Sequence, residues 1–540
     1  MTQRKIALQE GWLHLPVRRD APGHYVRLTS DGETLTELYL TLSETPDFYC
    51  AMDLTRLAGR EVTLTSETLP QALMDAILPG GPLDGRNPLY AGLYREPLRP
   101  QYHFSSRRGW LNDPNGLFFD GSLYHLFYQH NPYATTHGSV NIGWGHATSP
   151  DGVRWTQRPE AIQTLTSTDL IASGSCIIDR EGVAGYGKGA VIAAFTRLGT
   201  VDYHVSPHIV CPSLGQYLAY SQDGGDTFTL FPDNPAIPTQ DGKDWRDPRL
   251  FEHPDGGFGA AVYETNERGN CVSFYHSDDL HHWTRTSRAD DLYECPDLFR
   301  LTPVNGGEPK WVLYGADGMV RVGEFREGAF LQEGEKQPLD YGSSTYAGQT
   351  WNHHDDSEGR MHISWLLDAR HFWNGNAAYP DMPFSQCMTV ACLLTLERTP
   401  EGYRLRRNPV PAVDSLRQGE GDEVLARPAT KVCLLPCLSG DLDVEVRAES
   451  TLRVQAGRVW FTYDPQTGLA RFEGGKETVL QRKGPLRLRV LTDRTSCEFF
   501  LQGEISASYG QPMKDVPLEF SSADEFSLTG RRWAMQSIWG

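Results

Sequence analysis

The sequence predicts an all-β protein, in which a β-propeller follows a small N-terminal β domain and precedes a C-terminal β-sandwich. Three observations support this fold class. Short alternating runs of apolar and polar residues fill the first part of the chain, a turn motif with a trailing aromatic ring recurs in the middle, and longer alternating runs return after about residue 405. We therefore expect three domains, which cover residues 1–92, 93–404 and 405–540.

The N-terminal part has the pattern of short antiparallel strands. Residues 25–28, 35–40 and 61–65 alternate between apolar and polar side chains, and turns rich in Gly and Asp separate them. Nothing in this part has the form of a catalytic group. A structural or accessory role is therefore predicted, with direct sugar binding as the alternative.

The middle part repeats a turn that contains Ser and Asp and is followed by an aromatic ring. Successive rings are 73 and 55 residues apart, a spacing typical of propeller blades. We interpret the Asp residues of these turns as structural. The three rings are Trp155, Phe228 and Trp283.

The C-terminal part alternates more strictly than the rest of the chain. Residues 441–447 and 486–490 place an apolar side chain at every second position, and residues 464–468 form a turn signal. This pattern predicts the strands of a β-sandwich.

Composition excludes several classes of partner. A chain of 540 residues is too long for one ordinary core, and its net charge of -19 argues against nucleic acid, because phosphate binding needs clustered Lys and Arg. The N-terminus lacks an apolar run of signal-peptide length, and no window approaches about 18 apolar residues. We expect a soluble, cytoplasmic protein without a membrane partner; the oligomeric state is left open.

Cofactor signals are absent as well. The sequence has no Gly-rich phosphate loop, no metal-binding helix motif and no zinc spacing among its ten cysteines. We therefore expect no metal and no cofactor, and we predict that the cysteines are buried free thiols.

Three carboxylates that lie outside the recurring turns stand next to residues that could shape a site. Asp113 stands in the run Trp-Leu-Asn-Asp-Pro-Asn-Gly at residues 110–116, whose break signals predict bent, solvent-accessible backbone. On its own this run is an ordinary turn, so Asp113 is either a turn former or a reactive group. Asp247 and Glu294 are the other two carboxylates.

Further motifs follow Asp113 in a fixed order. They are Phe-Tyr-Gln (127–129), Asn-Pro (131–132), Trp-Gly-His-Ala (144–147), Ser-Gly-Ser (173–175), Trp-Arg-Asp-Pro (245–248), Glu-Cys-Pro-Asp (294–297) and Tyr-Ala-Gly-Gln-Thr (346–350). This series resembles glycoside hydrolase family 32, the invertases, levanases and inulinases that cleave β-fructofuranosyl bonds. The resemblance runs from about Tyr102 to the C-terminus.

The resemblance implies a propeller of five blades and a set of site residues. It implies that Asp113 is the nucleophile, that Asp247 stabilises the transition state and that Glu294 is the acid/base. The substrate-binding residues implied or suggested beside them are Asn112, Gln129, Trp144, Ser173, Arg246, Cys295 and Trp365.

The expected function is a retaining, exo-acting hydrolase that releases fructose from sucrose, levan or inulin. One alternative is a fructosyltransferase, including a difructose-forming one. Others are a non-catalytic carbohydrate-binding propeller and a sialidase-like or inverting arabinan-type propeller enzyme. Analysis of the products separates them.

Some positions depart from the family pattern. His137 stands where the family usually has Trp, Ala172 where it often has Phe, and Ser344-Thr345 where it often has Asp-Phe. These departures leave open the shape of the fructose pocket and the preference among sucrose, levan and inulin. His137 itself is either a sugar ligand or a residue of a surface loop.

Overall fold

The regular secondary structure of the described residues is almost entirely β-strand, so the predicted all-β class is confirmed. The structure is a computed structural model that describes residues 1–138, 140–164, 169–199, 215–237, 244–367, 379–435 and 437–539. In these ranges no helix is both long enough and apolar enough to cross a membrane. The short helical segments are α1 (Gln71–Asp75), η1 (Thr55–Leu57), η2 (Pro88–Tyr90) and η3 (Pro411–Leu416).

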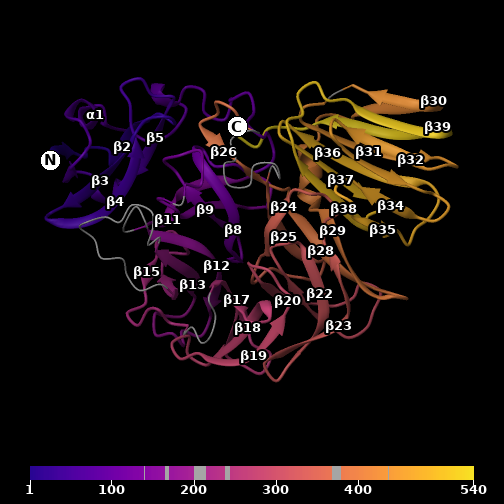
Figure 1. Ribbon diagram of the computed structural model, residues 1–540, viewed down its shortest axis with the longest axis horizontal. Helices are drawn as coiled ribbons and strands as arrows, with labels where there is room; N and C mark the ends of the chain where they lie inside the picture. The colour runs from indigo at the N-terminus through magenta and orange to yellow at the C-terminus, as the bar shows by residue number, and fades with distance from the viewer. Residues whose placement is uncertain are drawn as a thin grey trace.

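The N-terminal strands form two antiparallel sheets around one apolar core (Figure 1, indigo). Alternation buries Val26 and Leu28 in this core, as the sequence predicts. The first sheet has β1 (Thr2–Ala7), β6 (Glu61–Ser66), β3 (Gly23–Ser30) and β4 (Glu33–Thr41), and the second has β5 (Phe48–Asp53), β2 (Trp12–Val17) and β7 (Leu78–Gly80).

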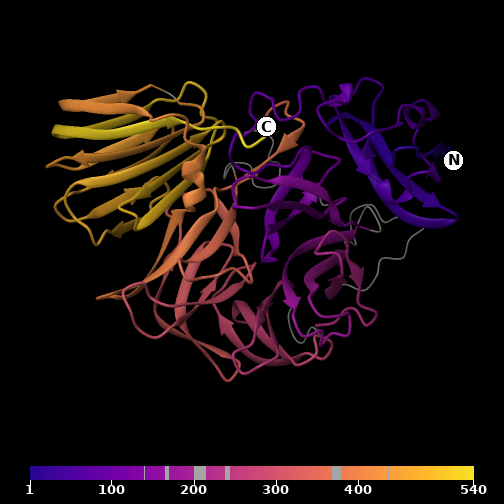
Figure 2. The ribbon, with the colours of Figure 1, turned by 180° about the vertical axis from the view of Figure 1, so that it is seen from behind.

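The described residues between 109 and 409 form five antiparallel sheets that follow one another around a common centre (Figures 1 and 2). The first sheet has β8 (Gly109–Phe119), β9 (Tyr124–Asn131), β10 (Gly143–Ser149) and β11 (Thr156–Ile162). The second has β12 (Asp169–Asp179), β13 (Ala190–Gly199), β14 (Gly215–Ser221) and β15 (Thr229–Leu230). The third has β16 (Trp245–Glu252), β17 (Phe258–Asn266), β18 (Gly269–Ser277) and β19 (Thr284–Asp290). The fourth has β20 (Asp297–Leu301), β21 (Lys310–Tyr314), β22 (Met319–Arg326) and β23 (Ala329–Pro338), and the fifth has β24 (Thr345–Thr350), β25 (Arg360–Leu366), β28 (Cys392–Thr399) and β29 (Gly402–Pro409).

Long-range pairing joins the fifth sheet to the first. Strand β26 (Phe384–Ser385) pairs in parallel with β8, and β27 (Cys387–Met388) pairs with β25. Asn352 exchanges backbone hydrogen bonds with Leu117 and Phe119 of β8. Because β8 also contacts β12, and β12 contacts β16, the first strands of these sheets lie side by side.

The recurring turns connect the third and fourth strands of the first three sheets. In each turn the Asp side chain accepts hydrogen bonds from backbone N–H groups, which is the structural role predicted for it. These residues are Asp151, Asp223 and Asp279.

The C-terminal strands form one continuous ten-stranded sheet, whereas a sandwich of separate sheets was expected. The cause is the length of β39 (Leu518–Ala534), whose first residues pair with β32 (Leu452–Ala456) and whose last residues pair with β31 (Gly440–Arg447). The sheet folds over a single core. Its other strands are β30 (Asp422–Leu434), β33 (Val459–Tyr463), β34 (Leu469–Phe472), β35 (Glu477–Val479), β36 (Leu486–Asp493), β37 (Ser496–Leu501) and β38 (Ile505–Gly510).

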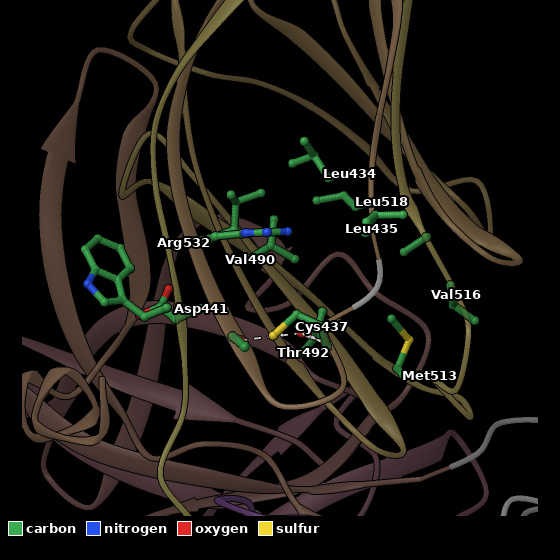
Figure 3. A pocket seen from close by; sticks show the side chains of 14 residues that line it. Leu434, Leu435, Cys437, Asp441, Val490, Thr492, Met513, Val516, Leu518 and Arg532 are labelled. Atoms are coloured by element: carbon green, nitrogen blue, oxygen red, sulfur yellow. Dashed lines mark hydrogen bonds between the residues drawn. The ribbon is translucent and has the colours of Figure 1, made fainter. Parts of the chain in front are cut away.

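An apolar hollow lies within this C-terminal region (Figure 3). Its lining includes Leu434, Leu435, Met513 and Val516, and it encloses about 480 Å³, part of it open to solvent. None of the predicted site residues lines it. The hollow therefore belongs to the edge of the C-terminal core.

The nine described cysteines are free thiols, and seven of them are buried. Cys433 is exposed and Cys437 is half-buried, so the prediction of burial is wrong for these two. Both lie at the end of β30, at the edge of the C-terminal core. Cys211 lies outside the described residues.

A buried ionic network joins the five-sheet region to the C-terminal sheet. The ring of His103 is fully buried, with Nδ1 at 3.0 Å from Asp493 Oδ2 and Nε2 at 2.9 Å from Glu498 Oε1. Burial lowers the pKa of His103, but hydrogen bonds and charge from the two carboxylates outweigh burial and raise it to about 9. The imidazolium thus pairs with two carboxylates from the C-terminal sheet.

His103→Gln is expected to lower the free energy of unfolding by about 3–5 kcal/mol near pH 6, because the buried Asp493 loses its cationic partner and Glu498 keeps only Arg407. The pKa of His103 is higher in the folded protein than its value of about 6.5 in the unfolded chain. The stabilisation by its charge is therefore fully present below about pH 6.5. It is lost as the pH rises through about 9.

Urea unfolding of both proteins at about pH 6 and pH 9.5 measures the difference. His282→Gln is the matched control, because the His282 side chain is 89% exposed and the change should have little effect. A stability gap that stays constant up to pH 9.5 would show that His103 is not charged in the folded protein.

Candidate active site

β-Bulges bend three neighbouring strands at residues predicted for the site. The antiparallel register shifts twice on β8 and once on each of β12 and β16, and shifted segments of these strands contain Asp113, Ser173 and Asp247, respectively. A bulge leaves a residue unpaired and changes the direction of its side chain. Three adjacent strands thereby bring polar groups to one place.

Asp113 accepts hydrogen bonds from three of the predicted substrate-binding residues. Its Oδ2 lies 2.6 Å from Ser173 Oγ and 3.3 Å from Gln129 Nε2, and its Oδ1 lies 3.2 Å from Asn112 Nδ2. Trp110 Nε1 donates to Asn112 Oδ1 at 2.8 Å and orients that amide. Asp113 is therefore held as the centre of a polar cluster, and the interpretation of it as only a turn former is wrong.

Cys295 connects two of the three carboxylates. Its Sγ lies 3.6 Å from Asp113 Oδ2 and 3.4 Å from Asp247 Oδ2, and its backbone N–H donates to Asp247 Oδ2 at 3.1 Å. Burial, together with these carboxylates, raises the pKa of the thiol, so it remains a neutral donor. The Asp247 backbone is fixed separately by its N–H, which donates to Thr196 Oγ1 at 2.8 Å.

Glu294 is held from two sides. Arg246 donates to its Oε1, and the hydroxyl of Tyr346 donates to its Oε2. Arg246 Nε also lies 3.7 Å from Asp247 Oδ2, and the Arg246 guanidinium lies 4.9 Å from the centre of the Tyr263 ring. Arg246 therefore links the second and third carboxylates, as Cys295 links the first and second.

The backbone around these carboxylates has an unusual conformation. The φ angles of Asp247, Glu294 and Cys295 are 63°, 47° and 38°, in the left-handed region that residues other than Gly rarely adopt. Each such residue costs about 1–3 kcal/mol, and such residues concentrate at functional sites. The surrounding structure stabilises a costly backbone so that these side chains converge.

Burial changes the acidity of the cluster. It raises the pKa of Asp113 to about 6; the Ser173 hydrogen bond opposes this rise, and the charge of Glu294 adds to it. Burial also raises the pKa of Asp247, with Arg246 opposing and Glu294 adding to the rise. Perturbed carboxylates in one buried cluster are typical of acid/base and nucleophilic sites.

Aromatic rings stand beside the carboxylates. Trp365 lies edge-on to Trp110 and to Tyr346, with ring centres 5.9 and 6.1 Å apart. It is only 1% exposed, so it supports these rings and offers little face to a sugar. His137 is 8% exposed and edge-on to Trp110 at 6.3 Å, so its interpretation as a surface-loop residue is wrong.

The structure corrects the prediction for Trp144. Its ring is fully buried on β10, packs against Phe127 and Phe195, and donates from Nε1 to the carbonyl oxygen of Ala172 at 3.0 Å. Trp144 therefore has no free face for substrate. It supports β12 at the residue before Ser173.

Sequence reasoning did not assign roles to three residues of the site. Tyr346 belongs to the motif at residues 346–350, and that motif was the available signal. Gln349, in the same motif, bridges β8 and β12 by accepting from Leu117 N–H and donating to the Gly174 carbonyl oxygen. Thr196 is part of no motif, and only the structure reveals its hydrogen bond to Asp247 N–H.

Comparison with known proteins supports the same picture. The levanase of Bacillus subtilis (strain 168) is 30% identical over 462 residues, which cover 75% of this chain and 65% of the levanase. The extracellular exo-inulinase inuE of Aspergillus niger is 29% identical over 365 residues, which cover 60% of this chain and 66% of that enzyme. The match thus spans slightly less than two thirds of each relative.

A solved structure shows a similar fold. The crystal structure of exo-inulinase from Aspergillus awamori superposes with a TM-score of 0.72 at 24% identity, covering 83% of this chain and all of that one. Residues 103–409 match the family model described as the glycosyl hydrolases family 32 N-terminal domain. That match includes every carboxylate of the cluster and more than half of the chain, and the protein belongs to glycosyl hydrolase family 32.

Proposed function

We propose that this protein is a retaining glycoside hydrolase that releases fructose from the ends of β-fructofuranosides. The convergence of Asp113, Asp247 and Glu294, linked by Cys295 and Arg246, carries this proposal. The names of the similar proteins, levanase and exo-inulinase, support the same substrate class.

In the first chemical step Asp113 attacks the anomeric carbon of the terminal fructosyl unit. Glu294 gives its proton to the leaving oxygen as that bond breaks, and a covalent fructosyl ester forms on Asp113. In the second step Glu294 removes a proton from water, which attacks the same carbon, releases fructose and frees Asp113.

Asp247 is proposed to bind sugar hydroxyls and to stabilise the positive charge that develops on the ring. Arg246 orients both Asp247 and Glu294. Asn112, Gln129 and Ser173 already contact Asp113 and can share their remaining hydrogen-bonding capacity with fructose hydroxyls.

Burial of the cluster supports attack at a chain end. Asp113 is 8% exposed and Asp247 is 5% exposed, so little of either carboxylate is open to solvent. We propose that a terminal unit reaches such buried groups more readily than the middle of a chain does.

Incubation with sucrose, levan and inulin, followed by chromatography of early products, tests the proposal. We expect fructose as the early product from the fructans, and proton NMR should show retained anomeric configuration before mutarotation. A ladder of oligosaccharides or a difructose product would indicate the transferase or an endo-acting enzyme. Absence of any product would favour the non-catalytic binding protein.

The pH profile should report Asp113. The nucleophile must be ionised, so kcat/KM is expected to fall as the pH drops through about 6, the raised pKa of this group. Ser173→Ala removes a hydrogen bond that lowers this pKa, and the acid limb should move to higher pH. Ser343→Ala, an exposed serine outside the cluster, is the control. An acid limb that does not move would assign it to another group.

His137→Trp is expected to change the ratio of sucrose to levan hydrolysis. The larger ring would press on Trp110, which orients Asn112 beside the nucleophile. Initial rates on both substrates measure this ratio, and His282→Trp, in an exposed turn of the third sheet, is the control. If His137→Trp and His282→Trp give the same ratio of sucrose to levan hydrolysis, His137 does not border the fructose pocket.

We also infer the finer architecture. The five sheets have the order and the closure through β26 that five propeller blades require, and the two halves of the folded C-terminal sheet face each other as in a sandwich.

We propose domains at residues 1–92, 93–409 and 410–540. The second boundary moves from 404 to 409 because β29 ends at Pro409. The cytoplasmic location stays a prediction.

A further inference from the structure

A groove lined by both polar and apolar residues separates the N-terminal strands from the outermost strand of the first sheet. It encloses about 870 Å³ of empty space, part of it open to solvent. One wall carries Trp12 of β2 and Asp53 of β5, which are cross-strand partners, and the opposite wall is β11. Asp113 lies on β8, three strands away from β11 in this sheet, so the groove is separate from the carboxylate cluster.

Hydrogen bonds join the N-terminal strand β4 to residues next to β10 and β11. Asn141, in the loop before β10, accepts from Tyr39 N–H at 3.0 Å and donates to the Tyr39 carbonyl oxygen at 2.8 Å. The Thr36 hydroxyl donates to the carbonyl oxygen of Thr164 at 3.0 Å. These contacts fix the N-terminal strands against the first sheet, so a ligand would lose little energy to rearrangement of the groove between them.

The lining of the groove suits a neutral sugar chain. Trp12 is partly exposed and offers a ring to the apolar face of a sugar. One oxygen each of Asp53, Gln157 and Glu160 already has a protein partner, and the second polar atom of each side chain can bind a hydroxyl. Arg107, Arg108 and Arg158 line the same groove as Asp53 and Glu160, so charges of both signs are present. The charge of Arg108 is offset by Glu96, whose Oε1 lies 2.9 Å from Arg108 Nη1. A lining of balanced charge does not concentrate anions, which distinguishes it from a phosphate site.

Two further hollows extend the groove along β11. One shares Gln163 with it and reaches the loop between β9 and β10, the loop that carries His137 beside the active-site ring Trp110. The other shares Gln157 and is lined by Trp155 and Trp539. The groove and these hollows therefore run along β11, and one end lies on a loop that borders the candidate active site.

We propose that this groove is a second carbohydrate site, which binds several units of a fructan chain outside the carboxylate cluster. The inference rests on the proposed fructan hydrolysis for its ligand. The N-terminal strands then form one wall of a polymer-binding site, and the first sheet carries both this site and the nucleophile.

Binding is measured on the full chain with Asp113→Asn, which keeps the polymer intact, by affinity electrophoresis in levan and in inulin. Adding Trp12→Ala is expected to weaken binding about tenfold, as loss of a central aromatic contact does. Gln163→Trp, at an exposed position, should weaken it by filling the groove without disturbing the fold. Trp460→Ala, at a partly exposed ring of the C-terminal sheet, is the matched control and should change nothing.

Kinetics separate this site from the active site. With Asp113 restored, Trp12→Ala should raise KM for fructans about tenfold while kcat and sucrose hydrolysis stay unchanged. Unchanged binding and KM in both groove variants would overturn the second site, even if fructose release is normal. Failure of the wild-type protein to release fructose would instead remove the proposed function, while electrophoresis still tests the groove. If the protein also binds a linear glucan, and Trp12→Ala weakens that binding as much as it weakens binding to levan and inulin, the assignment of the groove to fructans would be overturned.

Discussion

Asp113→Asn is expected to abolish fructose release, with kcat/KM falling by about 10⁴-fold or more on every fructoside. The amide has nearly the same shape as the carboxylate and keeps an oxygen for the Ser173 hydroxyl, which lies 2.6 Å from Oδ2. It has no negative charge with which to form the fructosyl ester. The loss therefore reports the chemistry of this position and not its packing.

Rates of fructose release from sucrose and from an activated fructoside measure the effect, and thermal unfolding verifies the fold. Asp223→Asn is the matched control, because Asp223 occupies a recurring turn, where its oxygens accept from Ser221 and Thr227. It should retain full activity. Activity within tenfold of the wild type for Asp113→Asn would exclude this residue as the nucleophile.

Glu294→Ala is expected to lower kcat/KM on sucrose by about 10³-fold, because a general acid contributes roughly 10²–10⁴-fold. On a fructoside with a 4-nitrophenolate leaving group the loss in kcat/KM should be less than about tenfold, because this group leaves without a proton. Hydrolysis of the ester on Asp113 still needs a base. The covalent intermediate should therefore accumulate.

A burst of 4-nitrophenol and mass spectrometry of the trapped protein detect that intermediate, and added azide should restore turnover without a base. Glu252→Ala, an exposed carboxylate on β16, is the control. Equal losses on sucrose and the activated substrate would assign the proton transfer to another group. The contrast with Asp113→Asn, which loses both activities, separates the two roles.

Local patterns determined much of the fold. The alternation around Val26 and Leu28, and the recurring turns at Asp151, Asp223 and Asp279, are consequences of burial and turn chemistry within a few residues. Pairing between distant strands is not contained in such patterns. The addition of β26 to β8 and the continuity of the C-terminal sheet through β39 therefore emerged only from the structure.

For the site, too, the sequence revealed one part and the structure another. The motifs around Asp113, Asp247 and Glu294 identified the candidate carboxylates, because their series along the chain resembles that of the family, whereas the run at Asp113 alone is an ordinary turn. The Cys295 bridge and the hydrogen bond from Tyr346 to Glu294 depend on bulges and positive φ angles that bring separate strands together.

Trp144 shows the limit most clearly. By itself the sequence determined that a tryptophan stands in a family motif, but not which side of the sheet it occupies. The tertiary structure buries that ring between neighbouring strands and turns its N–H toward Ala172, so the residue supports the site without facing it. Burial and direction are set by contacts between residues far apart in the chain, and a local pattern contains no information about those contacts.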